Sequence, residues 1–141
     1  MSRLDNIIRL HRWQLDEKRR RLVELQAMAD DTRRRIAALD REIREEAKSA
    51  DAAGGEAHPG SWQAYARTVR ERRENLEVTL CTIESQVGEI NEAIAEAFQE
   101  LKKFELISEA RARRVRETAA RREQFTLDEM ALTGFRRSSA S

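Results

Sequence analysis

The sequence is poor in the residues that build turns and compact cores. It has one cysteine, one proline and five glycines among 141 residues, and aromatic side chains make up only 5% of it. A single cysteine excludes an intramolecular disulfide. A layered globular fold needs more turns and more large apolar residues than this composition supplies. Because charged residues make up 38% of the chain, the composition instead indicates long helices.

Long apolar runs are also absent, and no stretch approaches the roughly 20 residues needed to cross a bilayer. Residues 1–6 lack the apolar segment of a signal peptide. We therefore expect a soluble, cytoplasmic protein. The net charge of +1 gives no overall attraction toward nucleic acid or an acidic membrane.

An apolar residue recurs every 3.5 positions from Trp62 to Phe104. Of the thirteen seam positions in this stretch, twelve are apolar, and Arg73 is the exception. A helix with such a stripe must bury it along another helix in left-handed coiled-coil packing.

A second stripe precedes it, from Leu4 to Ile43, with polar residues at three of its twelve seam positions. Between the stripes, residues 51–60 hold four of the six glycines and prolines of the chain. A single break between two stripes predicts an antiparallel hairpin. Within this break, Gly54 and Gly55 are expected to end the first helix, Pro59 to suit the entry to the second and Ser61 to cap it.

The predicted fold is all-α: a long two-helix antiparallel coiled-coil hairpin with a projecting C-terminal helical overhang, forming a single domain over residues 1–141. Ser2 and Asp5 form a capping-box pattern at the start. Thr126 and Glu129 form another, which predicts a short separate turn ended by Gly134. In residue numbers, we expect a first helix at about 3–50, a turn at 51–60, a second helix at about 61–125 and a flexible tail at 134–141.

Two registers of the hairpin fit the stripes. One places Arg73 beside Thr32, and the other, shifted by one heptad, places it beside Leu39. We prefer the first, because an unpaired arginine in an apolar seam is costly to desolvate. The oligomeric state stays open, since the exposed flanks of a hairpin can recruit another hairpin.

The apolar seam fails after Phe104, although no glycine or proline interrupts residues 105–122. We expect these residues to form a lone helix beyond the hairpin, because the first helix ends near this point. Ser108, Arg111, Thr118 and Arg122 occupy its seam positions.

Catalytic motifs are missing. There is no glycine-rich phosphate loop, and the two histidines, His11 and His58, lie far apart on the hairpin. We therefore expect no enzyme activity, no cofactor and no metal site. His11 is expected to pack in the seam, and Cys81 to be an unreactive surface thiol. Trp13 lies outside the seam and is either an exposed contact residue near the open end or folded over the side of the seam.

Two segments resemble the FliJ family of the flagellar type III protein export apparatus. They are residues 10–20 (LHRWQLDEKRR) and residues 98–105 (FQELKKFE), the latter followed by the arginine-rich helix. The length of the chain and its single long hairpin also agree with the family. The resemblance implies a soluble protein at the cytoplasmic face of the flagellar base.

It also implies a stalk-like protein that inserts the open end of the hairpin into the hexameric export ATPase and promotes assembly and activity of the ring. The resemblance further implies contact with an export gate protein and escort of export chaperones. We expect no small-molecule substrate. Carried onto this sequence, the ATPase contacts are Arg9, Arg12, Trp13, Lys102, Lys103, Arg111, Arg113, Arg114 and Arg116, and the gate contacts are Leu39, Trp62 and Tyr65.

Two other functions remain open from the residues. A generic cytoplasmic coiled-coil scaffold or adaptor would form a stable homodimer through its stripes, whereas a stalk would be a monomer that gains partners at its open end. An RNA-binding basic helix would show salt-sensitive binding without any ATPase. The arginines are spread around the helix without interleaved aromatics, which makes RNA the less favoured of the two.

Overall fold

The computed structural model describes residues 2–52 and 59–140. Two helices account for this part of the chain: α1, Arg3–Ala52, and the longer α2, Pro59–Ala140. The predicted all-helical class, with two long helices packed against each other, is confirmed. Gly54, Gly55 and His58 of the predicted turn lie outside the described residues. The described residues of the predicted turn, which are 51, 52, 59 and 60, belong to the two helices.

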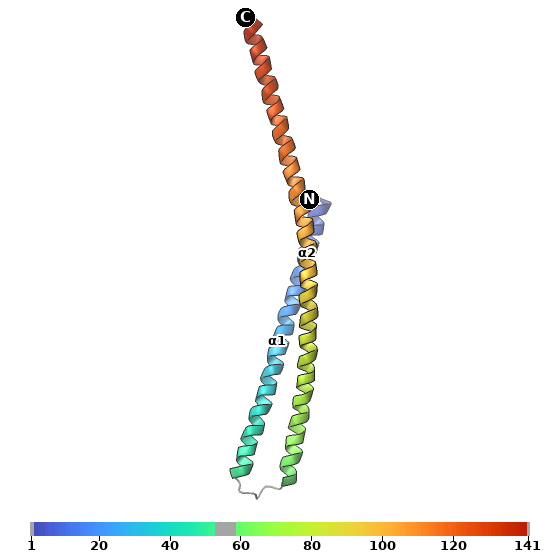
Figure 1. Cartoon of the computed structure of the whole chain (residues 1–141), viewed down its shortest axis with the longest axis vertical. Coiled ribbons are helices and arrows are strands. Elements are labelled where there is room, and N and C mark those ends of the chain that lie inside the picture. Colours follow the sequence, from blue (N-terminus) through green and yellow to red (C-terminus); the bar gives the residue numbers. More distant parts are fainter. Residues whose placement is uncertain (1, 53–58, 141) are drawn as a thin grey trace. The chain divides into compact units, whose positions relative to one another are not determined.

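The contacts divide the chain into two units, residues 14–96 and residues 1–13 with 97–141. Each unit contains a part of α1 and a part of α2, which run antiparallel (Figure 1). The prediction that the whole chain forms one domain stays a prediction.

The core of the 14–96 unit is a row of side chains from the two predicted stripes. Leu25, Ala29 and Ile83 are buried together. Leu25 is only 1% exposed, and burying a leucine stabilises the folded state by about 1.5–3 kcal/mol. Three further seam residues of α2 are packed against this cluster: Leu80, Val87 and Ile90.

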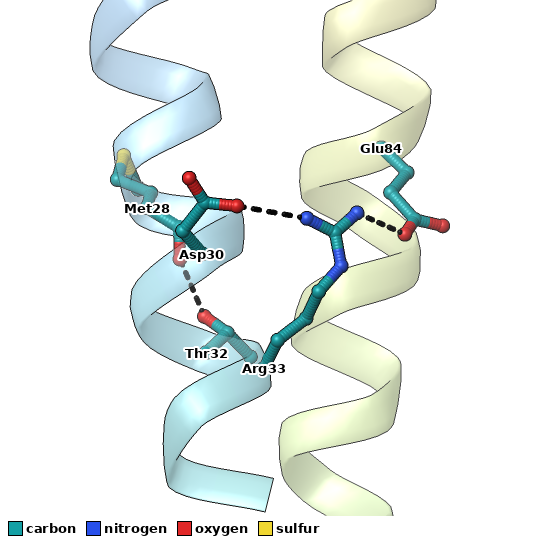
Figure 2. A network of polar contacts seen from close by, with 5 residues as sticks. All are labelled: Met28, Asp30, Thr32, Arg33 and Glu84. Atoms are coloured by element: carbon teal, nitrogen blue, oxygen red, sulfur yellow. Dashed lines mark hydrogen bonds and ion pairs between the residues drawn. The ribbon is translucent and has the colours of Figure 1, made fainter. Parts of the chain in front are cut away.

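Polar contacts on the flank of this core join α1 to α2 (Figure 2). The guanidinium of Arg33 donates to Asp30 on its own helix at 3.1 Å and to Glu84 across the pair at 3.0 Å. Thr32, the buried polar residue of the seam, donates its hydroxyl to the carbonyl oxygen of Met28 at 2.8 Å. A hydroxyl that bonds one turn back lets threonine occupy the seam without leaving a polar group unsatisfied.

The preferred register is wrong. Arg73 donates from Nε to Asp40 at 2.8 Å, and Asp40 lies two helical turns beyond Thr32 and directly after Leu39. The alternative register therefore holds. Its supposed penalty disappears because Arg73 is paired: it also donates to Glu77, and the hydrogen bond to Asp40 is the main cause of its raised pKa.

The capping box at the start of α1 is confirmed. The Asp5 amide donates to Ser2 Oγ at 3.2 Å, and the Ser2 amide donates to the Asp5 carboxylate at 3.2 Å. The second bond lowers the pKa of Asp5, because an amide donor stabilises the charged carboxylate.

The predicted C-terminal end of the second helix and its predicted cap are wrong, whereas its start agrees with the expected one to within two residues. The helix begins at Pro59, whose fixed backbone suits a first helical position, so Ser61 lies inside it instead of capping it. It also passes 125 and continues to Ala140, with no separate turn and no non-helical stretch over 134–140. The Thr126 hydroxyl donates to the Arg122 carbonyl at 2.9 Å, which is a bond of a helix interior. The expected flexibility of the tail stays a prediction.

Candidate interaction surface

The C-terminal part of α2 is a helix without a packing partner among the described residues. Leu101 is buried and Ala110 is half-buried, whereas every residue over 111–140 is exposed. Within the unit of residues 1–13 and 97–141, no other segment lies beside this part of α2 in Figure 1. The overhang therefore begins about six residues later than Glu105, where the sequence placed its start, since the register that holds pairs α1 with a later part of α2.

The start of α1 is anchored to α2 by a histidine that packs against an aromatic ring. The rings of His11 and Phe104 are stacked, with their centroids 4.9 Å apart. This confirms His11 as a packed seam residue. On the flank, Arg12 Nη2 lies 3.9 Å from the Glu105 carboxylate, and Arg12 remains 61% exposed. Such an exposed ion pair contributes little to stability and leaves Arg12 accessible to a partner.

The other predicted ATPase contacts at this end are exposed. Trp13 is 59% exposed, which rules out the alternative in which it folds over the seam. Arg9, Lys102 and Lys103 are exposed as well. Lys102 Nζ lies 5.6 Å from the centre of the Phe98 ring, in a cation–π contact. All of the predicted ATPase contacts, including the four arginines of the overhang, belong to the unit of residues 1–13 and 97–141.

The four arginines predicted on the overhang are exposed and carry no ion pair with any residue in 2–52 or 59–140. They are Arg111, Arg113, Arg114 and Arg116. A guanidinium without a protein carboxylate keeps its charge and its donors available for an external anionic group. This distinguishes them from Arg33 and Arg73, whose charges are used inside the hairpin.

The three predicted gate contacts all belong to the 14–96 unit, where two of them come together. The rings of Trp62 and Tyr65 lie 5.9 Å apart. Tyr65 donates its hydroxyl to Glu42 at 2.6 Å, and this bond raises the pKa of Tyr65 to about 12. Leu39 instead lines a hollow with Arg72 and Leu76, which neither Trp62 nor Tyr65 lines.

Sequence reasoning missed a group of exposed apolar side chains near the end of α2, because it divided this region into a turn and a tail. The uninterrupted helical composition up to residue 133 was the available signal. Phe135 is 72% exposed, which is uncommon for so large an apolar ring. The group consists of Phe125, Leu127, Met130, Leu132 and Phe135.

No three His, Cys, Asp or Glu side chains gather to hold a metal ion in the part of the chain that is described. Cys81 is exposed, as predicted. Neither helix contains a stretch long and apolar enough to cross a membrane, over the residues described.

Comparison with family models matches residues 1–140 to the model described as flagellar FliJ protein. Comparisons with curated proteins and with solved structures give no match. The family match covers almost the entire chain, and the coiled-coil hairpin with its longer second helix agrees with it. The chain therefore belongs to the FliJ family and is a non-catalytic coiled-coil component of the flagellar type III protein export apparatus.

Proposed function

We propose that this protein is a stalk-like activator of the hexameric flagellar export ATPase, which it binds through the unit of residues 1–13 and 97–141. The observation that carries the proposal is the exposed helix over 111–140, whose first turns present four arginines without ion-pair partners. A long helix without neighbours can enter a ring, and its charge is available to groups inside that ring.

Electrostatic attraction supplies the first step of the proposed binding. Complementary charge raises the rate of encounter between two proteins, and this rate enhancement falls as the ionic strength rises. Arg113 and Arg114 are consecutive and so point in directions about a quarter of a turn apart. Because the positive charge is spread around the helix, the helix can bind a ring of acidic loops in several rotational orientations. Binding then does not require one fixed orientation.

Apolar contact is proposed to supply the second step. Trp13 combines high exposure with a large ring, and tryptophan and arginine are the residue types most often found to dominate binding energy. It lies two residues from His11, which is packed on Phe104, so the backbone that presents it is held by the core. We therefore assign Trp13, Arg9 and Arg12 to the ATPase interface together with Lys102 and Lys103.

The hairpin unit, residues 14–96, is proposed to contact the export gate and to take part in the escort of export chaperones. Trp62 and Tyr65 form a paired aromatic surface, and Leu39 lines a separate hollow of the same unit. Both features sit on a packed pair of helices, which favours a defined contact. We propose that the protein works at the cytoplasmic face of the flagellar base.

The test is to mix the purified chain with the export ATPase of the same cell and to measure ATP hydrolysis and ring formation together. We expect the chain to stimulate both, and removal of residues 111–141 to abolish the effect. The charge-reversal variant Arg111→Glu, Arg113→Glu, Arg114→Glu should bind the ATPase at least tenfold more weakly in low salt, since about 1.4 kcal/mol corresponds to a factor of ten.

The matched control reverses three exposed arginines of the hairpin unit, Arg41, Arg67 and Arg70, and should bind like the unmodified chain. This control changes the net charge equally, so a selective loss assigns the effect to the overhang. Equal binding by both variants and the unmodified chain in low salt would overturn the placement. No stimulation by the unmodified chain would overturn the proposed function itself.

A further inference from the structure

The exposed part of α2 has opposite charge in its two halves. Residues 111–122 contain six arginines and one glutamate, whereas residues 123–135 contain three acidic residues and neither lysine nor arginine. All of these side chains are exposed on one continuous helix. A basic surface is thus followed directly by an acidic one.

Large apolar side chains lie in both halves at positions that continue the seam spacing of residues 62–104. Val115 in the basic half is 68% exposed, and Phe125 in the acidic half is 66% exposed. Two of the six seam positions over 111–129 thus carry an exposed apolar side chain that a second helix could cover. The polar seam positions of the segment are Arg111, Thr118, Arg122 and Glu129.

We propose that residues 111–129 of α2 pair antiparallel with the same residues of a second copy of this chain. A parallel pair would place arginines against arginines and carboxylates against carboxylates, and such like-charge contacts are destabilising. An antiparallel pair places the basic half of each copy against the acidic half of the other. Charge complementarity therefore selects both the occupant and its direction.

The seam residues of the two copies match in this direction. Val115 faces Phe125 of the second copy, and Arg111 faces its Glu129. The two-fold axis repeats each contact, so one register forms two apolar pairs and two ion pairs. Thr118 faces Arg122 of the second copy on each side of the axis, where the long arginine can direct its charge toward solvent.

The flanking positions add to the match. Arg114 and Asp128 precede seam positions, so they lie on the same flank and meet across the pair. Arg121 lies beside its own counterpart at the axis, which is the one like-charge contact of this flank. Glu117 is one turn earlier on the same helix and offsets it.

The other parts of the chain and a lipid surface fit this segment less well. The start of α1 is packed against α2 only as far as Ala110. A helix that lies on a membrane separates its charged and apolar residues onto opposite faces. Here Arg113 and Arg114 point in different directions, and the acidic residues Asp128 and Glu129 lie among the apolar side chains.

Sedimentation equilibrium of the full chain tests the pairing. We expect a monomer–dimer equilibrium for the unmodified chain. Arg111→Glu with Arg114→Glu should raise the dimer dissociation constant at least tenfold, and so should Asp128→Arg with Glu129→Arg, because each double variant creates like-charge contacts. An equimolar mixture of the two double variants should restore association, and so should one chain that carries all four substitutions.

The restoration by four substitutions in one chain is specific to the antiparallel pair, since a parallel pair would keep its like-charge contacts in every variant. Arg136→Glu with Arg137→Glu is the matched control outside the paired residues and should not weaken the dimer. Circular dichroism of each variant checks that the helices are kept. A monomer at every concentration, or a dimer that both double variants leave unchanged, would overturn the proposal.

Discussion

At the scale of single residues, the hydroxyl of Tyr65 joins the two helices near the turn through its bond to Glu42. An anionic acceptor stabilises the protonated phenol, so the pKa of Tyr65 rises from 10.0 to about 12. Because the folded-state pKa is raised, the bond contributes stability in full below pH 10. That contribution is lost as the pH rises from 10 toward 12.

We predict that the absorbance change of tyrosinate has its midpoint near pH 12 in the folded protein and moves toward 10 in Glu42→Gln. Tyr65 is the single tyrosine of the chain, so the signal belongs to this residue alone. Glu45→Gln, which changes the charge equally on an exposed neighbour, is the control. An unchanged midpoint in Glu42→Gln would show that the hydrogen bond is absent in solution.

Leu25 is the clearest test of the core, because it is almost completely buried beside Ala29 and Ile83. Leu25→Ala is expected to lower the free energy of unfolding by about 2–5 kcal/mol, since it leaves a cavity that neighbours fill only in part. Chemical denaturation followed by circular dichroism measures the loss. The neighbouring Val23 is 65% exposed, so Val23→Ala should change stability by no more than about 0.5 kcal/mol.

At the scale of the helices, apolar spacing was sufficient to predict the hairpin, because burying a 3.5-residue stripe has few structural solutions. It did not predict the register, which depends on Arg73 finding Asp40 across the pair, a contact that no local pattern contains. The helix end was missed because Thr126 to Glu129 reads equally well as a cap and as a helix interior. The exposure of the overhang arginines followed from their position beyond the hairpin, whereas the sequence left two placements open for Trp13 and the structure shows it exposed.

The overhang differs from the hairpin in what stabilises it. Most helical stability in proteins comes from packing of an apolar face, and residues 111–140 have none within the described chain. We predict that their amide hydrogens exchange much faster than those around Leu25 and Ile83 in the dilute protein. Hydrogen exchange with mass spectrometry checks this. Equal protection of both regions would contradict it and would mean that a partner covers the overhang.

Gly134 decides between a continuous helix and the separate turn that the sequence predicted. A Cβ added at this residue would meet nothing within 4 Å, and the residue lies inside α2. Gly134→Ala should therefore stabilise the local helix by about 1 kcal/mol and slow amide exchange around it. Gly88→Ala, also helical and uncrowded, is the control for the substitution itself. Faster exchange around residue 134 would indicate that the glycine ends the helix.

At the scale of the whole molecule, the two proposals use the same arginines. Arg111 and Arg114 are assigned both to the ATPase and to the second copy, so one partner should exclude the other. The dimer would then hold the overhang in a form that cannot enter the ring. The apparent affinity for the ATPase then equals the affinity of the monomer multiplied by the fraction of chain that is monomeric.

Phe125→Ser separates the two partners, because it removes an apolar contact of the proposed dimer and leaves every assigned ATPase residue intact. We predict that this variant is more monomeric than the unmodified chain. In the concentration range where the unmodified chain is largely dimeric, the variant should reach the same stimulation of the ATPase at a lower total protein concentration than the unmodified chain. Stimulation measured across a concentration series, with the mass determined in parallel, tests both statements. A dimer found intact on the ATPase ring would refute the competition, because the arginines would then serve both partners together.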